Sequence, residues 1–130
     1  MPEPQRGSVA GEISRRAVQL LAEYTGRGPT NAHTVISRDA ITILLGDTLT
    51  KGERRLAKLG MADHVLETRS RYQQVMKDEL ISTVEECSGR KVSAFMSANH
   101  IDPDMSAEVF VLEPVTVAKG LDDAGDGEST

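Results

Sequence analysis

The residues with the clearest chemical potential lie in the short polar segment SANHIDPDM, residues 97–105. It holds His100, Asp102 and Asp104 close together, and such side chains can bind a metal ion or move protons. The segment lacks the glycine and the length of a calcium-binding loop. Asn, Asp and Pro103 are also residues that tight turns prefer. We therefore expect a hairpin turn with no metal bound, and metal-assisted hydrolysis is the weaker alternative.

A second candidate is TGRGPT, residues 25–30, in which Arg27 and Gly28 resemble parts of an anion site. Glycine lets the backbone approach a ligand, and a guanidinium suits phosphate or carboxylate. The segment follows the expected C-terminus of a helix, however, whereas phosphates favour helix N-termini. A glycine cap is the preferred interpretation, and the matching SGRK with Arg90 supports it. The alternative is a sensor of a small anion or nucleotide that binds through Arg27 and Arg90.

Composition narrows the range of functions. The net charge of −5 disfavours binding to nucleic acid or anionic lipid, and aromatic residues are only 3% of the chain. The single cysteine, Cys87, excludes an intrachain disulfide and a thiolate metal cluster. No apolar run is long enough to cross a membrane, and the first residues do not resemble a signal peptide. We expect a cytoplasmic protein without a cofactor.

Hydrophobic periodicity predicts three helices and two hairpins. An amphipathic helix over about 9–24 precedes a β-branched hairpin over about 30–45. Thr50 and Glu53 have the spacing of a capping box, which begins a short helix. A long helix over about 62–87 then ends at SGRK, and a second hairpin surrounds the polar segment.

The two halves of this pattern are alike, because each reads as a helix, a Thr/Ser-Gly-Arg stop, a polar strand and a more apolar strand. The pattern predicts an α+β fold, a two-layer sandwich with a four-stranded antiparallel sheet and helices on one face. Its (αββ)2 repeat resembles a circularly permuted ferredoxin-like fold with one inserted helix. The second and fourth strands should be central, and the other sheet face should be open to a partner, a tail or a second copy.

The length of 130 residues predicts one domain with one core. Residues 8–118 form this domain. Residues 1–7 are expected to be a flexible leader, and residues 119–130 a disordered acidic tail, because neither segment has enough apolar surface to order itself.

The long helix and the open sheet face are the expected surfaces for homodimerisation. Tyr72 and Met76, near the middle of the helix, are candidate interface residues. The charged residues of the same helix are expected to face solvent; they are Arg69, Arg71, Lys77, Asp78 and Glu79.

Three segments together resemble one family: YTGRGPT, EECSGRKVSAFMS and, most specifically, HIDPDMSAEVFVLEP. The chain is similar over about Glu12–Pro114 to the MpsC-like family, named after a component of a Na⁺-translocating, membrane-potential-generating system. The family positions worth inspection are Arg27, Gly28, His100, Asp102, Pro103, Asp104 and Glu113. No catalytic residues are carried over. The resemblance implies a link to membrane complexes with cation or bicarbonate transport roles, in which other subunits span the membrane.

The leading functional hypothesis is therefore a non-enzymatic, cytosolic accessory or regulatory module with a protein partner, such as subunits of a membrane transport system. The chain itself is expected neither to insert into the membrane nor to bind nucleic acid.

Overall fold

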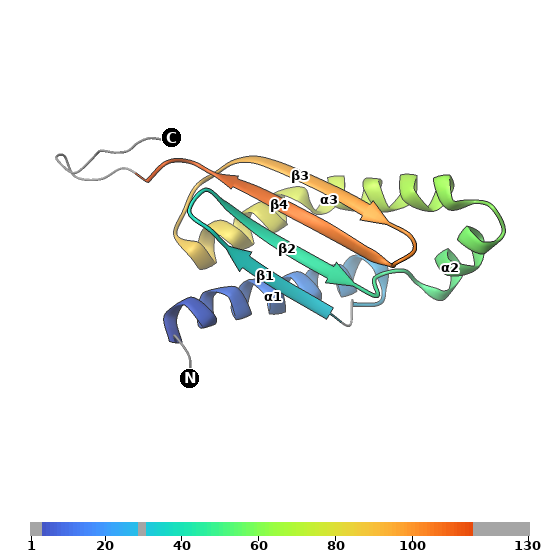
Figure 1. Ribbon diagram of the computed structural model, residues 1–130, viewed down its shortest axis with the longest axis horizontal. Coiled ribbons are helices and arrows are strands. Elements are labelled where there is room, and N and C mark those ends of the chain that lie inside the picture. Colours follow the sequence, from blue (N-terminus) through green and yellow to red (C-terminus); the bar gives the residue numbers. More distant parts are fainter. Residues whose placement is uncertain (1–3, 29–30, 116–130) are drawn as a thin grey trace.

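The computed structural model describes residues 4–28 and 31–115 of the chain (Figure 1). Three helices and four strands lie within these ranges. In chain order they are α1 (Pro4–Thr25), β1 (Asn31–Ile36), β2 (Ala40–Gly46), α2 (Lys51–Lys58), α3 (Ala62–Ser88), β3 (Val92–His100) and β4 (Met105–Leu112).

The strands form one antiparallel sheet in the order β1-β2-β4-β3. The predicted α+β class is confirmed, and so is the prediction that the two more apolar strands, β2 and β4, are central. The likeness to a permuted ferredoxin-like fold stays a prediction. The first predicted hairpin is formed by β1 and β2, and at its turn the backbone N–H of Ser37 donates to the carbonyl oxygen of Ala40 at 2.9 Å.

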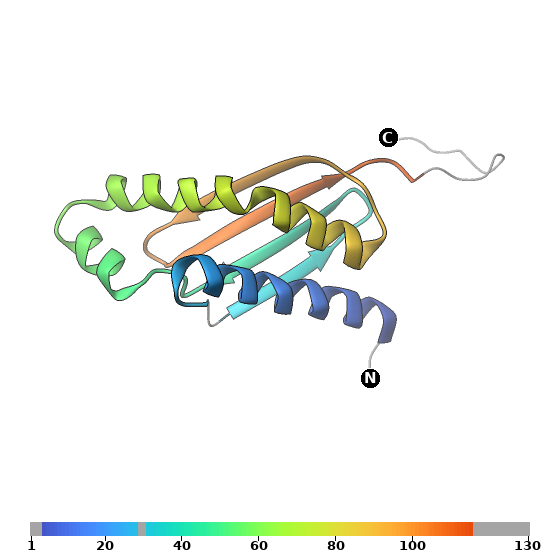
Figure 2. The ribbon, with the colours of Figure 1, turned by 180° about the vertical axis from the view of Figure 1, so that it is seen from behind.

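Two layers make up the fold, because α1 and α3 lie side by side on one face of the sheet (Figure 2). Strand alternation sends every second side chain toward these helices. The core between the layers is formed by Ile13, Ala17, Leu20, Leu21, Ile41, Ile43, Leu45, Met76, Leu80, Val84, Phe110 and Leu112. No helix of the described residues covers the opposite face, onto which Figure 1 looks.

Local signals fix the helix ends. The Thr50 side chain accepts a hydrogen bond from the backbone of Glu53, whose carboxylate accepts one from the backbone of Thr50, so the predicted capping box begins α2. Gly26 follows α1 with a φ of 80°, and Gly89 caps α3 with a φ of 72°. Glycine takes this left-handed conformation without steric cost, which explains why both segments end a helix.

The helix α1 begins at Pro4, inside the segment that composition predicts to be a flexible leader. Each residue added to an existing helix gains one backbone hydrogen bond, so a helix can extend beyond the segment that its apolar pattern predicts. The domain boundary at residue 8 stays a prediction. Residues 1–3 and the predicted tail over 119–130 lie outside the described residues.

Candidate functional site

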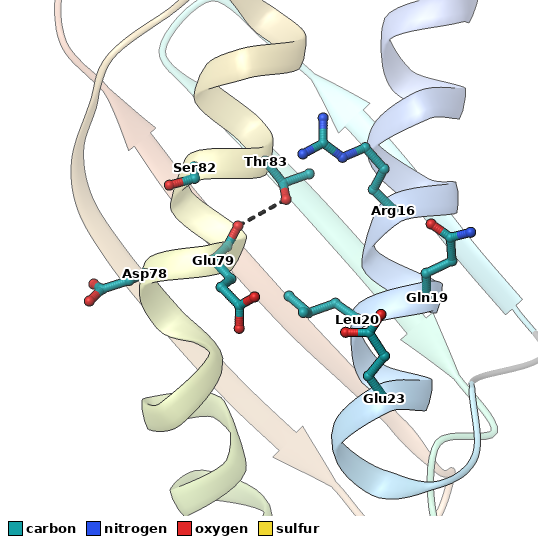
Figure 3. Close-up of a pocket in the computed structure, with 8 residues that line it drawn as sticks. All are labelled: Arg16, Gln19, Leu20, Glu23, Asp78, Glu79, Ser82 and Thr83. Atoms are coloured by element: carbon teal, nitrogen blue, oxygen red, sulfur yellow. Dashed lines mark hydrogen bonds between the residues drawn. The ribbon is translucent and has the colours of Figure 1, made fainter.

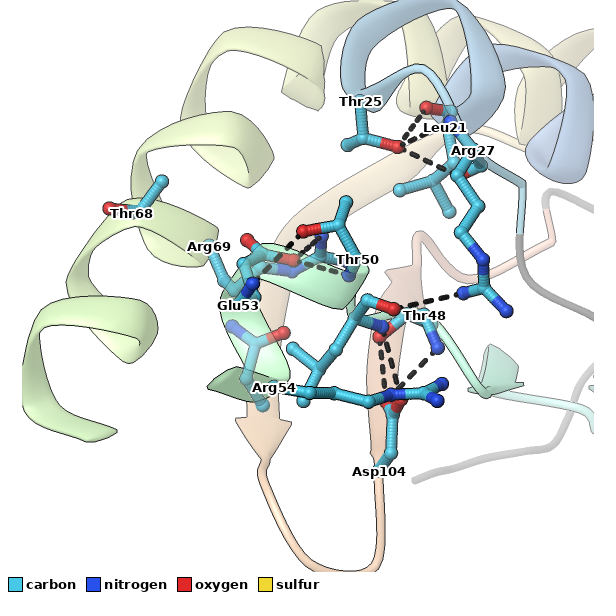
Figure 4. A network of polar contacts seen from close by, with 12 residues as sticks. Leu21, Thr25, Arg27, Thr48, Thr50, Glu53, Arg54, Thr68, Arg69 and Asp104 are labelled. Carbon is cyan, nitrogen blue, oxygen red and sulfur yellow. Dashed lines mark hydrogen bonds and ion pairs between the residues drawn. The ribbon is translucent and has the colours of Figure 1, made fainter. Parts of the chain in front are cut away.

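Asp104, immediately before β4, links the second hairpin to the β2–α2 loop (Figure 4). Its Oδ1 accepts hydrogen bonds from the backbone N–H and the hydroxyl of Thr48, both at 3.0 Å. Its Oδ2 accepts one from the backbone N–H of Leu49 at 3.0 Å and lies 3.4 Å from the Arg54 guanidinium. Both carboxylate oxygens are therefore engaged in holding two loops together.

Arg27 holds the same β2–α2 loop from the other side. Its Nη1 donates to the carbonyl oxygens of Asp47 at 2.6 Å and Leu49 at 3.0 Å, and its Nη2 pairs with the Asp47 carboxylate at 2.9 Å. Arg54 pairs with that carboxylate as well. The guanidinium of Arg27 thus donates its hydrogen bonds to groups of the chain itself. Its role here is to hold the loop in place.

Gly28 lies next to Arg27 for a steric reason. A Cβ atom at this position would lie 3.1 Å from Val18 Cγ1 and 3.3 Å from the Val18 carbonyl oxygen. The absence of a side chain lets the segment after α1 run close against the helix. This close approach favours the structural interpretation of the TGRG segment over the anion-binding one.

Arg90 lies at the opposite end of the sheet. Its Nη2 donates to the carbonyl oxygens of Arg38 at 3.3 Å and Glu113 at 3.1 Å. Arg38 precedes β2, whereas the contacts of Arg27 follow it, so the length of this strand separates the two arginines. The structure therefore does not bring them together in one anion site. Glu113 contributes backbone atoms here, and its side chain is exposed.

The other polar residues of the second hairpin form a turn. Nδ1 of His100 hydrogen-bonds with the carbonyl oxygen of Pro103 at 2.8 Å, the Asp102–Pro103 peptide bond is cis, and Asp102 is exposed. Asp104 points instead to the β2–α2 loop. Among residues 4–28 and 31–115, no group of three or more His, Cys, Asp or Glu side chains is placed to hold a metal ion.

The two residues proposed for an interface on the long helix lie against the core. Met76 is completely buried within the single chain, and Tyr72 is partly buried against the same cluster. The expectation that Met76 lies on a contact surface is wrong, because the face of α3 that carries it is the face that packs on the sheet. A dimer therefore requires another surface.

The sequence pattern also misplaced Arg69, which is buried although we expected it to face solvent. It follows Val65 by four residues, so it lies on the same helical face. Its Nη1 lies 3.4 Å from Oε1 of Glu53, which places an ion pair between α3 and α2. A buried arginine with a carboxylate partner is a costly arrangement that composition alone does not reveal.

Near Arg69 lies a buried polar cluster that the sequence analysis missed. Glu108 is only 1% exposed, and its Oε2 accepts a hydrogen bond from Nε2 of Gln73 at 2.9 Å. The amide of Gln73 also exchanges two hydrogen bonds with Asn99, at 2.7 and 3.3 Å. Oε1 of Glu108 has no hydrogen-bond partner among the described residues. Among these residues, therefore, only one oxygen of the buried carboxylate has a hydrogen-bond donor.

Burial has a direct electrostatic consequence for this carboxyl. Loss of solvation raises the pKa of Glu108 to about 7, and the hydrogen bond from Gln73 and the charge of Arg69 oppose the rise only in part. The group therefore titrates near neutral pH. Strand parity could have located it, because Glu108, Phe110 and Leu112 alternate onto one face of β4.

A groove with a volume of about 350 Å³ runs between α1 and α3 (Figure 3). Acidic side chains line part of it, among them Asp78 and Glu79, and both are exposed. Glu79 accepts a hydrogen bond from the Tyr24 hydroxyl at 2.5 Å, and Arg16 pairs with Glu86 at 2.9 Å. These are contacts between two neighbouring helices and do not define a ligand site.

The fold and its polar contacts define a small two-layer α+β domain whose loops are fixed by internal ion pairs. Residues 5–114 match the family model described as "Na+-translocating membrane potential-generating system (MpsC)". The chain belongs to the MpsC family.

A relative in Bacillus subtilis (strain 168), the uncharacterized protein YbcI, is 33% identical over 92 residues. The matched region covers 69% of this chain and 73% of YbcI. No solved structure matches the chain. Within the described residues, none of the helices has the length and apolar character needed to span a membrane.

Proposed function

We propose that this chain is a non-enzymatic, cytosolic accessory or regulatory module of a Na⁺-linked, membrane-potential-generating system. The match of residues 5–114 to the MpsC family is the observation that carries the proposal. In such a system the module would bind a membrane subunit and alter the flux of Na⁺ or bicarbonate.

The contacts of the candidate residues support an accessory role over the two alternatives. Asp104 and Arg27 hold the β2–α2 loop, and Arg90 joins the turn before β2 to the segment after β4. An anion sensor that uses both arginines has less support, because they lie at opposite ends of β2. Hydrolysis at His100, Asp102 and Asp104 has less support as well, since these side chains diverge.

The test compares a host strain with and without the gene. Everted membrane vesicles from the two strains should differ in Na⁺-dependent membrane potential, read with a voltage-sensitive dye, and in uptake of labelled Na⁺ and bicarbonate. Purified chain added to the deficient vesicles should restore the difference. Replacement of Na⁺ by K⁺ is the ion control. Equal flux in both strains, with no binding of the chain to vesicles, would overturn the proposal.

A thermal-shift screen separates this role from the sensor alternative. Bicarbonate, phosphate and adenine nucleotides are tested on the wild-type chain and on Arg27→Ala, and each protein is compared with its own ligand-free Tm. The accessory role predicts no shift. A rise in Tm that only the wild type shows would favour the sensor, because a ligand that binds the folded state stabilises it.

A further inference from the structure

The uncovered face of the sheet is largely apolar. Four of its large hydrophobic side chains are exposed: Val35 by 45%, Leu44 by 38%, Met96 by 53% and Met105 by 39%. The register places side chains from all four strands in rows across this face, and the central row is Val35, Thr42, Val109 and Met96. The other positions on the face are Asn31, His33, Ala40, Gly46, Ala94, Ala98, His100, Ala107 and Val111.

This face also carries no Asp, Glu, Lys or Arg at any of these strand positions, although such residues make up 27% of the chain. Among the described strand positions of this face, the only titratable side chains are those of His33 and His100, on the edge strands β1 and β3. A contiguous apolar surface of this kind on a soluble domain marks an interaction site. Its occupant must be uncharged and nearly flat, because a charged group buried here would find no ionic partner.

We propose that the uncovered face binds the same face of a second copy of this chain. Two such faces are complementary in charge, because neither carries a formal charge at its strand positions. Packing of two sheets face to face is a common architecture, with the sheets about 10 Å apart. A two-fold axis near the centre of the central row would place β2 and β4 of one copy over β2 and β4 of the other.

The size of the face approaches what a stable dimer needs. Four strands about 4.8 Å apart and roughly 25 Å long give a flat area of about 500 Å² per copy. The solvent-accessible area of the face is larger than this flat area, because side chains make the surface uneven. It therefore comes closer to the buried area of a standard interface, which is about 800 Å² per partner. A dimer of this kind would form whether or not the chain serves a transport system.

Two other occupants fit the face less well. The C-terminal segment 119–130 holds four acidic residues and one lysine, and burial of these acids on an uncharged surface would remove them from water without compensation. An anionic membrane surface would be repelled by the net charge of −5. A second copy carries the same net charge, but the face that it would present has no Asp, Glu, Lys or Arg at its strand positions, so its charges lie away from the contact.

The first test measures the mass of the full-length chain by sedimentation equilibrium over a range of concentrations. The wild type should reach twice the mass of one chain at micromolar concentration. Leu44→Lys, at the centre of the face, should raise the dissociation constant at least tenfold, because each copy would bury an unpaired charge. Val75→Lys is the matched control, since Val75 is 62% exposed on α3 and should leave the dissociation constant unchanged.

The second test needs no variant and applies even if Leu44→Lys fails to fold. Copies labelled at methionine methyl groups are mixed with copies labelled at leucine and valine methyl groups. Intermolecular NOEs should connect Met96 and Met105 of one copy with Leu44 and Val109 of the other. A monomeric wild type at high micromolar concentration, NOEs only to residues of the C-terminal segment, or a dimer that Val75→Lys alone dissociates would each overturn the proposal.

Discussion

Two carboxylates near each other on the β4 segment differ in how well their charges are compensated by hydrogen-bond partners. Asp104 immediately precedes β4 and accepts hydrogen bonds at both oxygens from a neighbouring loop. Glu108 lies inside β4, is buried, and has one oxygen with no hydrogen-bond partner among the described residues. The first charge stabilises the fold because its partners are in place. The charge of Glu108 lowers the stability of the fold, because it is buried without enough partners. This loss of stability is smaller when the carboxylate takes up a proton.

The largest expected effect follows from removal of the satisfied carboxylate. Asp104→Ala would leave the backbone N–H groups of Thr48 and Leu49 without acceptors, and both residues are buried. We expect the free energy of unfolding to fall by about 3 to 4 kcal/mol, since several hydrogen bonds to a charged group are lost at once. Urea unfolding followed by circular dichroism measures this change.

Asp102→Ala is the matched control, because Asp102 lies two residues away and is exposed. Its effect should stay within about 0.5 kcal/mol. Equal losses for the two variants would contradict the view that Asp104 is the residue that joins the hairpin to the β2–α2 loop.

The unsatisfied carboxylate should make stability depend on pH. The pKa of Glu108 is about 7 in the folded chain, against an ordinary value of 4.5. Between these values the folded state retains a proton that the unfolded state has released. The proton on Glu108 therefore makes its full contribution to the free energy of unfolding below about pH 4.5. This contribution declines as pH rises and is lost above about pH 7. The total change is on the order of 3 kcal/mol.

Glu108→Gln isolates this contribution, because the amide keeps the size of the side chain without its charge. The variant should lose the decline between pH 4.5 and 7 and should be more stable than the wild type at pH 8. Urea unfolding at a series of pH values measures both effects. Glu113→Gln, a change at an exposed glutamate, should leave the decline in place. If Glu108→Gln declined as steeply as the wild type, another group would be responsible.

Most of the fold could be predicted from the sequence because its signals are local. β-branched hairpins, a capping box and glycine stops identify the elements, and the apolar character of β2 and β4 identifies the central strands. The turn at His100 and Pro103 was predicted from the same kind of signal. Such features depend only on residues that are close together in the chain, so they can be recognised from the sequence.

The buried polar cluster was missed because its partners come from distant segments. Gln73 and Glu108 are 35 residues apart in the chain, and each residue type is ordinarily exposed. Helical spacing does place Gln73 three residues before Met76, on the core face. For Gln73 and for Arg69, helical position therefore predicts burial better than residue type does.

A smaller effect is expected at Arg27, which supports the loop that Asp104 holds. Arg27→Ala removes two hydrogen bonds to carbonyl oxygens and one ion pair, all partly exposed. We expect a loss of about 2 kcal/mol in urea unfolding. Arg27→Lys should recover only part of it, because an ammonium group cannot match the planar fork that reaches Asp47 and Leu49 together. Full recovery by lysine would show that charge alone matters.

Arg90 provides the smallest expected effect and the sharpest contrast with Arg27. Its guanidinium reaches two carbonyl oxygens at 3.1 and 3.3 Å, both bonds are exposed, and no carboxylate pairs with it among the described residues. Water can replace such bonds, so Arg90→Ala should cost less than about 1 kcal/mol in urea unfolding. The two arginines occupy equivalent places in the sequence repeat, yet only Arg27 has a carboxylate partner. A loss at Arg90 as large as that at Arg27 would show that the carbonyl contacts, and not the ion pair, account for the stabilisation.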